Sequence, residues 1–176
     1  MYFVINGNDG SSELTIKGYR CRDHCPVDPN EEQEESEPTF WSEPTTWTNV
    51  FDPVRIPEAG DEVRIITGMN VIYDMEESPI FKSIAIDGKL SFASGLNAKI
   101  HAQNIWVRRG EMNIGKVDEP YDGTIEFALY GSDDDAPAEF TFDPDVVISN
   151  SNFIVTGALN AYAAPRTRFT RLLAPA

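Results

Sequence analysis

The chain has 176 residues, which suits a single domain of ordinary size. Its 14 Lys and Arg against 29 Asp and Glu give a formal charge of 14 − 29 = −15, which argues against a nucleic-acid binder and against a polybasic membrane-surface module. Twelve Gly and twelve Pro favour a loop-rich all-β chain, and no apolar run is long enough to span a membrane.

The first forty residues predict a hairpin followed by a linker. Residues 2–17 hold two short apolar runs, YFVI and LTIKGY, around the turn-forming stretch NGNDGSS. We expect residues 1–25 to be an N-terminal hairpin or the end of a preceding β domain, cut from a larger protein. The stretch 26–40 is rich in Glu and Pro and predicts a solvated acidic linker.

From residue 60 onward the chain repeats short alternating apolar runs, most of them in pairs divided by a glycine. The runs are VRIITGMNVIYD, SIAIDGKLSF, NIWVRRGEMNIG, TIEFALYG and NFIVTGALNAY. Their glycines, at 68, 88, 110, 131 and 157, are spaced 20, 22, 21 and 26 residues apart. This period predicts a β-solenoid whose coils stack alternate side chains inward, with glycine at the bend between two faces.

Two other structures fit parts of the pattern. A β-sandwich of hairpins also places strands at regular short spacing, and it remains the alternative fold. No stretch has a 3.6-residue period over three turns, and the best helical candidate is a short piece within LNAKIHAQN at 96–104.

The same stretches resemble the G8 domain, an extracellular family named for eight glycines. The resemblance begins at WSEPTTW, continues through IPEAGDEVRIITGMNVIYD and covers residues 41–135, while residues 136–176 resemble the strands that lead from a G8 domain into a following β-helix. The family's glycine after the second tryptophan is missing here. Seven glycines fit the family pattern: Gly60, Gly68, Gly88, Gly110, Gly115, Gly123 and Gly131.

The resemblance implies an all-β module built as the first coils of a right-handed, parallel β-helix-like solenoid. It also implies an extracellular or cell-surface location, although the first residues carry no signal-peptide pattern. The expected role is non-catalytic: the module caps a β-helix, contacts flanking domains of its own chain, and takes part in recognition of a matrix polysaccharide such as hyaluronan or of a cell-surface protein. The alternatives are the leading part of a polysaccharide-depolymerising enzyme and a mechanical spacer.

Cys21 and Cys25 are the only cysteines, and they flank His24 in a C-x-x-x-C segment. In an extracellular protein we expect a disulfide, either between these two or with a neighbouring domain. Free thiols are a second possibility. A zinc site is a third, although only three of the four usual ligands lie here.

Tryptophans and arginines provide the candidate ligand contacts. Trp106 alternates with inward neighbours and should face outward or against a neighbouring segment. With Arg108 and Arg109 it forms the candidate ligand-contact group, since aromatic rings stack on sugars and cations bind acidic groups. Trp41 and Trp47 are expected to cover the open end of the first coil.

No residue pattern predicts catalysis or a cofactor. Neither a nucleophile elbow, nor an H-E-x-x-H pair, nor a phosphate-binding glycine loop is present. His101 follows an inward Ile100 and should point outward. The acidic loops at Glu119 and Asp122 and at 133–135 are compatible with calcium, but they lack EF-hand spacing and are expected to be solvated.

Overall fold

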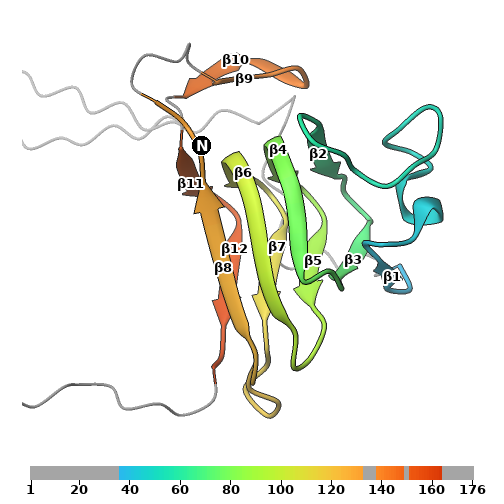
Figure 1. The fold of residues 1–176 in the computed structure, drawn as a ribbon, viewed down its shortest axis with the longest axis vertical. Helices are drawn as coiled ribbons and strands as arrows, with labels where there is room; N and C mark the ends of the chain where they lie inside the picture. Colours follow the sequence, from blue (N-terminus) through green and yellow to red (C-terminus); the bar gives the residue numbers. More distant parts are fainter. Residues whose placement is uncertain (1–35, 133–137, 149–150, 164–176) are drawn as a thin grey trace, which may run out of the picture. The chain divides into compact units, whose positions relative to one another are not determined.

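The computed structural model describes residues 36–132, 138–148 and 151–163, and these residues form an all-β unit (Figure 1). Cys21, Cys25 and the predicted N-terminal hairpin lie outside the described residues. The described residues contain one short 3₁₀ helix, η1, and twelve strands. Their bounds are β1 Thr39–Phe40, η1 Pro44–Trp47, β2 Glu62–Ile65, β3 Asn70–Tyr73, β4 Glu77–Ile86, β5 Lys89–Phe92, β6 Asn97–Val107, β7 Glu111–Ile114, β8 Thr124–Leu129, β9 Ala138–Phe140, β10 Asp143–Ile148, β11 Asn152–Val155 and β12 Ala158–Ala161.

The strands form two sheets of parallel strands, and the chain passes from one sheet to the other and back. One sheet has the order β1-β3-β5-β7-β12, and the other has the order β11-β6-β4-β2 with β8 also paired to β6. Among the described strands only β9 and β10 pair antiparallel. A sandwich of hairpins requires antiparallel neighbours, so the parallel pairing favours stacked coils over the alternative β-sandwich.

Each coil places its residues directly above those of the coil before it. Val63 pairs with Ile84 and Ile84 with Ile105, while in the other sheet Val71 pairs with Leu90. The 20- to 22-residue spacing of the repeat therefore corresponds to one turn of the chain around the core. From residue 97 on, the predicted helical piece at 96–104 belongs to β6, because its small and apolar residues alternate with period two.

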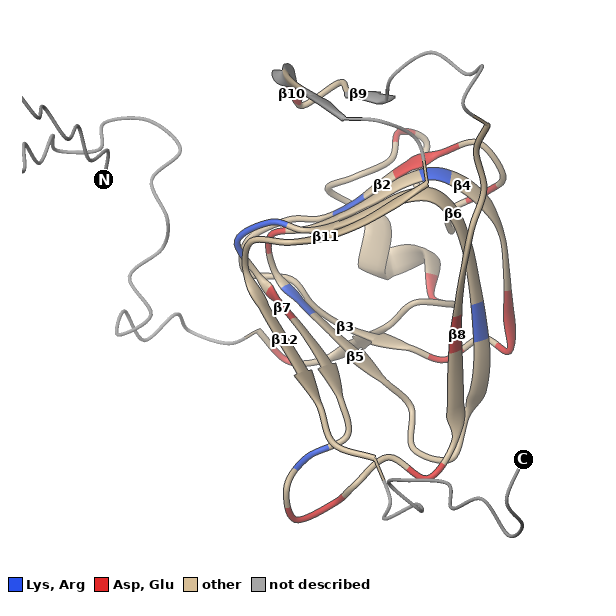
Figure 2. Ribbon diagram, turned by 90° about the vertical axis from the view of Figure 1, so that its left-hand side faces the viewer, with Lys and Arg blue, Asp and Glu red and all other residues tan. Residues whose placement is uncertain are grey.

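The fourth coil differs from the rhythm predicted by the sequence. Strand β8 pairs with the first half of β6, and β11 pairs with its second half. The two repeat units expected around Gly131 and Gly157 are thus two parts of one coil, interrupted after β8. The β9–β10 hairpin lies in this interruption and covers the outer side of the β2-β4-β6-β11 sheet (Figure 2).

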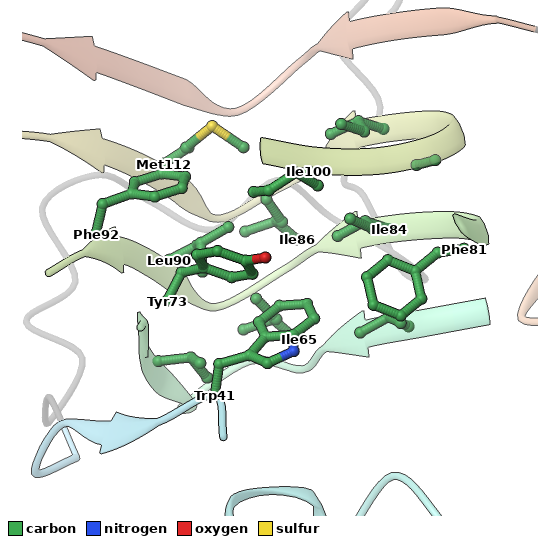
Figure 3. Close-up of a cluster of buried hydrophobic side chains, with 14 of the residues drawn as sticks. Trp41, Ile65, Tyr73, Phe81, Ile84, Ile86, Leu90, Phe92, Ile100 and Met112 are labelled. Carbon is green, nitrogen blue, oxygen red and sulfur yellow. The ribbon is translucent and has the colours of Figure 1, made fainter. Parts of the chain in front are cut away.

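Aromatic side chains form a column through the middle of the stack. Ring centroids lie 4.8 Å apart for Trp47 and Trp41, 5.2 Å for Trp41 and Tyr73, and 5.8 Å for Tyr73 and Phe92. The column continues through Phe127 and Phe153 in the last coil. Branched aliphatic residues and Met112 fill the space beside it (Figure 3). Each coil thus buries its apolar residues against those of its neighbours.

Glycine is required at the corner where the chain passes between the two sheets. A Cβ atom on Gly110 would overlap the carbonyl oxygen of Gly88, and one on Gly157 would overlap that of Gly110. These carbonyls accept hydrogen bonds from Glu111 and Ala158 of the next turn. At the first corner Gly68 instead has φ +88°, a left-handed conformation that side chains disfavour. Gly131 follows β8 and is not one of these corner glycines.

The N-terminal end of the stack is closed by residues 39–56. Thr39 and Phe40, which the sequence places in the linker, pair with β3 as strand β1. Trp41 and Trp47 are buried below the first coil, and the indole of Trp47 donates a 2.9 Å hydrogen bond to the Trp41 carbonyl. Both tryptophans cover the first coil, in the position that the sequence predicts for them.

Candidate functional site

The outer side of the β2-β4-β6-β11 sheet is buried at its two central strands, where Ser83, Ala85, Asn104 and Trp106 point away from the core. The register forms two outward rows, Glu62-Ser83-Asn104-Asn152 and Arg64-Ala85-Trp106-Ile154. Asp87 and Arg108 follow at the ends of β4 and β6. We call this surface the covered face, because the β9–β10 hairpin lies on it.

Two arginines on the covered face share one buried carboxylate. Arg108 donates to Asp87 from Nε at 2.6 Å and from Nη2 at 2.8 Å, and Arg64 Nε donates to Asp87 at 2.9 Å. Burial alone would raise the pKa of the Asp87 carboxyl. The hydrogen bonds from Arg108 and Arg64 outweigh it and hold that pKa below its ordinary value.

The hairpin supplies the second carboxylate. Arg108 Nη1 donates a 2.8 Å hydrogen bond to Asp143, and the Phe142 ring lies under both guanidinium groups, 4.7 Å from Arg64 and 5.1 Å from Arg108. Thr141 donates from its backbone N–H and its hydroxyl to the Glu62 carboxylate. The Asp143 carboxylate, the Phe142 ring and the Thr141 hydroxyl, all in one short segment, thus each contact a charged side chain of the sheet.

An aromatic contact completes the cover. Phe140 is buried with its ring centroid 5.2 Å from that of Trp106. The Trp106 indole N–H donates to the Thr156 hydroxyl at 3.0 Å. Trp106 faces away from the core, as its alternation predicts, and it is only 8% exposed because the hairpin covers it.

Two buried polar atoms of the covered face have no hydrogen-bond partner among the described residues. They are Ser83 Oγ and Asn104 Nδ2, which belong to neighbouring positions of one outward row. Asn104 Oδ1, in contrast, accepts from the backbone N–H of Asn152 at 3.1 Å. A buried donor without a hydrogen-bond partner lowers the stability of the fold, so these two atoms mark a place where the face is incompletely satisfied.

The structure brings two of the three predicted ligand-contact residues together. Trp106 and Arg108 lie on the covered face, with the Arg108 guanidinium 5.6 Å from the Trp106 ring. Arg109 follows at the corner and is half-buried. A ligand role for these three stays a prediction. Sequence reasoning missed Arg64, Asp87 and the hairpin, because only the parallel register places residues from separate coils side by side.

A second polar cluster lies on the outer side of the β4-β6-β8 strands. His101 Nδ1 is 2.7 Å from the Tyr130 hydroxyl, and His101 Nε2 is 3.0 Å from a Glu77 carboxylate oxygen. His101 lies on the outward row, as predicted, and these contacts bury it. Glu77 and Tyr130 are exposed, and the cluster therefore joins three strands at the surface.

The remaining candidates are a metal site, the disulfide and a membrane-spanning segment. Within the described ranges, no three His, Cys, Asp or Glu side chains come together as a group able to hold a metal ion. The acidic run at 133–135 and both cysteines lie outside those ranges, so the disulfide stays a prediction. In the same ranges no helix has the length and apolar character needed to cross a membrane.

The C-terminal end of the described stack is open, unlike its N-terminal end. In the inward rows Val71, Leu90 and Met112 are buried, but Leu159 in the last coil is 43% exposed. Ile125, Phe127 and Phe153 are only partly buried. The last coil therefore shows apolar side chains and a strand edge without a further coil among the described residues.

Comparisons with known proteins identify the family of this chain. The family model of the G8 domain matches residues 46–173. The chain is 29% identical to fibrocystin of Canis lupus familiaris over 137 residues, and 31% identical to fibrocystin of Mus musculus over 93 residues. These matches cover 77% and 52% of this chain but only 3% and 2% of the fibrocystins. No solved structure matches significantly. With more than half of its length matched by the family model, the chain belongs to the G8 domain family.

Proposed function

We propose that this chain is a non-catalytic extracellular module that begins a right-handed parallel β-helix in a larger cell-surface protein. In this proposal the module closes the N-terminal end of the helix and takes part in recognition of a matrix or cell-surface partner. Its similarity to small portions of two fibrocystins supports its place in a larger protein. The observation that carries the proposal is the contrast between the two ends of the stack.

The closed end has the features of a terminus. Trp41, Trp47 and η1 cover the first coil, and both indoles are buried. The open end has the features of an interior level, because Val155 and Leu159 continue the inward rows yet are 41% and 43% exposed. A further coil placed there would bury these side chains and pair the strand edge, which removes the risk of wrong edge pairing.

Self-association tests the open end. We expect the wild-type chain to associate as its concentration rises, because an uncovered coil edge is a template for another edge. The double variant V155K/L159K should suppress association with little change in melting temperature. Sedimentation velocity measures the first effect, and circular dichroism measures the second.

A matched control comes from two other apolar side chains of similar exposure. Val54 and Ile80 are each 45% exposed and lie away from β11 and β12. V54K/I80K should leave association unchanged. A wild-type chain that stays monomeric at all concentrations, or a control pair that suppresses association as well as V155K/L159K does, would contradict the proposal for the open end.

The non-catalytic and recognition parts need separate measurements. Incubation with hyaluronan should leave its length distribution unchanged, and shortening of the polymer would favour the enzyme. Binding to an array of matrix glycans and cell-surface ectodomains should be saturable for at least one member. Uniformly absent binding would favour a mechanical spacer.

A further inference from the structure

We propose that the covered face is a binding face for a partner peptide, and that the β9–β10 hairpin is its internal occupant. The partner peptide would be an extended segment with an aromatic residue next to an acidic one. It would place its carboxylate on Arg108 and its ring against the two guanidinium groups, where Asp143 and Phe142 lie now. Arg64, Asp87 and Arg108 belong to the first three coils and the open end belongs to the last coil, so the self-association experiment does not test this proposal.

The charges of the face favour an acidic partner. Without the hairpin, Arg64, Arg108 and Asp87 carry 2 − 1 = +1, and Glu62 of the same face is paired with Lys82, in a chain whose formal charge is −15. Asp143 of the hairpin brings this cluster to zero. Arg108 donates two hydrogen bonds to Asp87, so its guanidinium is oriented before a carboxylate arrives.

The hairpin is an addition to the coil and closes no gap in the ladder. Together β8 and β11 pair with both halves of β6, and β9 and β10 pair with each other. For residues 140–143 the contacts with the face run through side chains of the hairpin or the sheet: Phe140, Phe142 and Asp143 from the hairpin, and Glu62 from β2. Displacing these residues would leave the parallel ladder of the coils intact.

The hairpin also matches the face incompletely. Ser83 Oγ and Asn104 Nδ2 are buried in the outward row next to that of Arg64 and Trp106, and neither has a hydrogen-bond partner among the described residues. Both can donate, and backbone carbonyls of an extended peptide are acceptors. A partner that satisfies these donors as well as Arg108 would match the face better than the hairpin does. The present occupant is itself a peptide, which favours a peptide over an acidic sugar.

A peptide added in trans tests this proposal. The probe is a fluorescein-labelled peptide with the sequence of residues 138–148, and the protein is the full 176-residue chain. The wild type should bind the probe weakly, because the hairpin competes at an effective concentration of about a millimolar. The double variant F142A/D143N should loosen the hairpin and bind the probe at least about tenfold more tightly by fluorescence anisotropy.

The matched control changes the probe and leaves the protein alone. A second peptide carries alanine at the position of Phe142 and asparagine at the position of Asp143. It should bind the double variant about as weakly as the native probe binds the wild type. D143N alone keeps both rings and the fold, and it should give a smaller increase in binding of the native probe. The order wild type, D143N, F142A/D143N is the expected result.

Two outcomes would overturn the proposal. One is that D143N and the double variant, both folded by circular dichroism, bind the native and the substituted peptide equally. The other is that oligomers of glucuronic acid bind the double variant while the native peptide does not, which would assign the face to an acidic sugar. Neither outcome affects the proposal for the open end.

Discussion

Two glycines show how one residue type meets different needs at the same corner. At Gly110 there is no room for a side chain, because the carbonyl of the coil below lies where a Cβ would be. At Gly68 there is room, but φ is +88°. The two positions should therefore respond differently to substitution.

We expect Gly110→Ala to lower the free energy of unfolding by about 2 to 3 kcal/mol, since the added methyl group forces the stacked backbones apart. Gly68→Ala should cost only about 1 kcal/mol, and Gly68→Asn less, because asparagine tolerates the left-handed region. Urea unfolding of the three variants measures these differences. Equal losses at both positions would contradict the steric explanation for Gly110.

The Asp87 carboxylate makes stability depend on pH. Its pKa is lower in the folded chain than in the unfolded one, so its contribution is full above the ordinary value of about 3.9 and is lost as pH falls below it. Asp87→Asn should reduce stability at pH 7 by about 3 kcal/mol, the size expected when one partner of a buried ion pair is removed.

The same variant should flatten the fall in stability below about pH 4, because it removes a group that gains a proton as the pH falls. Unfolding midpoints across this range check the expectation. Glu76→Gln, which removes one exposed charge, serves as the control. A variant whose stability falls as steeply as that of the wild type would show that other carboxylates dominate.

At the scale of elements, β6 shows why the local pattern alone could not decide between a helix and a strand at 96–104. The stretch 96–104 contains small residues, alanines among them, and alanine favours a helix in isolation. Nevertheless β6 is paired between β4 and β8, and its residues Ala98, Ile100 and Ala102 point into the core. Pairing with strands on both sides outweighs the local preference, because it satisfies the backbone and buries the apolar side.

The hairpin is the element that should separate most easily from the rest. Phe140→Ala removes its buried ring from Trp106 and should raise hydrogen exchange and protease cleavage at 138–148 by about tenfold or more. Amides of β3, β5 and β7 should keep their protection. Mass spectrometry of exchanged peptides resolves both regions. Loss of protection in the ladder at the same rate would mean that the hairpin is part of the cooperative core.

At the scale of the whole stack, the two ends differ in how much they contribute. Trp47→Ala should lower the free energy of unfolding by about 3 to 5 kcal/mol, because it leaves a cavity below the first coil. Leu159→Ala, in the open last coil, should cost less than about 1 kcal/mol. Denaturant unfolding compares the two. Similar losses would show that the last coil is as well covered as the first.

The sequence by itself determined the all-β class, the length of a coil, the family and the outward position of Trp106. Period-two alternation and a 20- to 22-residue repeat are local properties, and they can be read along one chain. The pairing of Trp106 with Arg108 was also predictable, because only one residue separates them and alternate residues of an extended chain point to the same side.

Only the tertiary structure decided what lies beside what. Arg64, Asp87 and Arg108 belong to three coils, and the parallel register alone brings them together. The sequence showed the repeat TIEFALYG as a coil of its own, because alternation does not say which strand a run will pair with. The register joins it to β11 in one interrupted coil, and the segment between them became the hairpin that covers the arginines. The glycine spacing varies from 20 to 26 residues, so the repeat by itself does not fix which residues of separate coils pair.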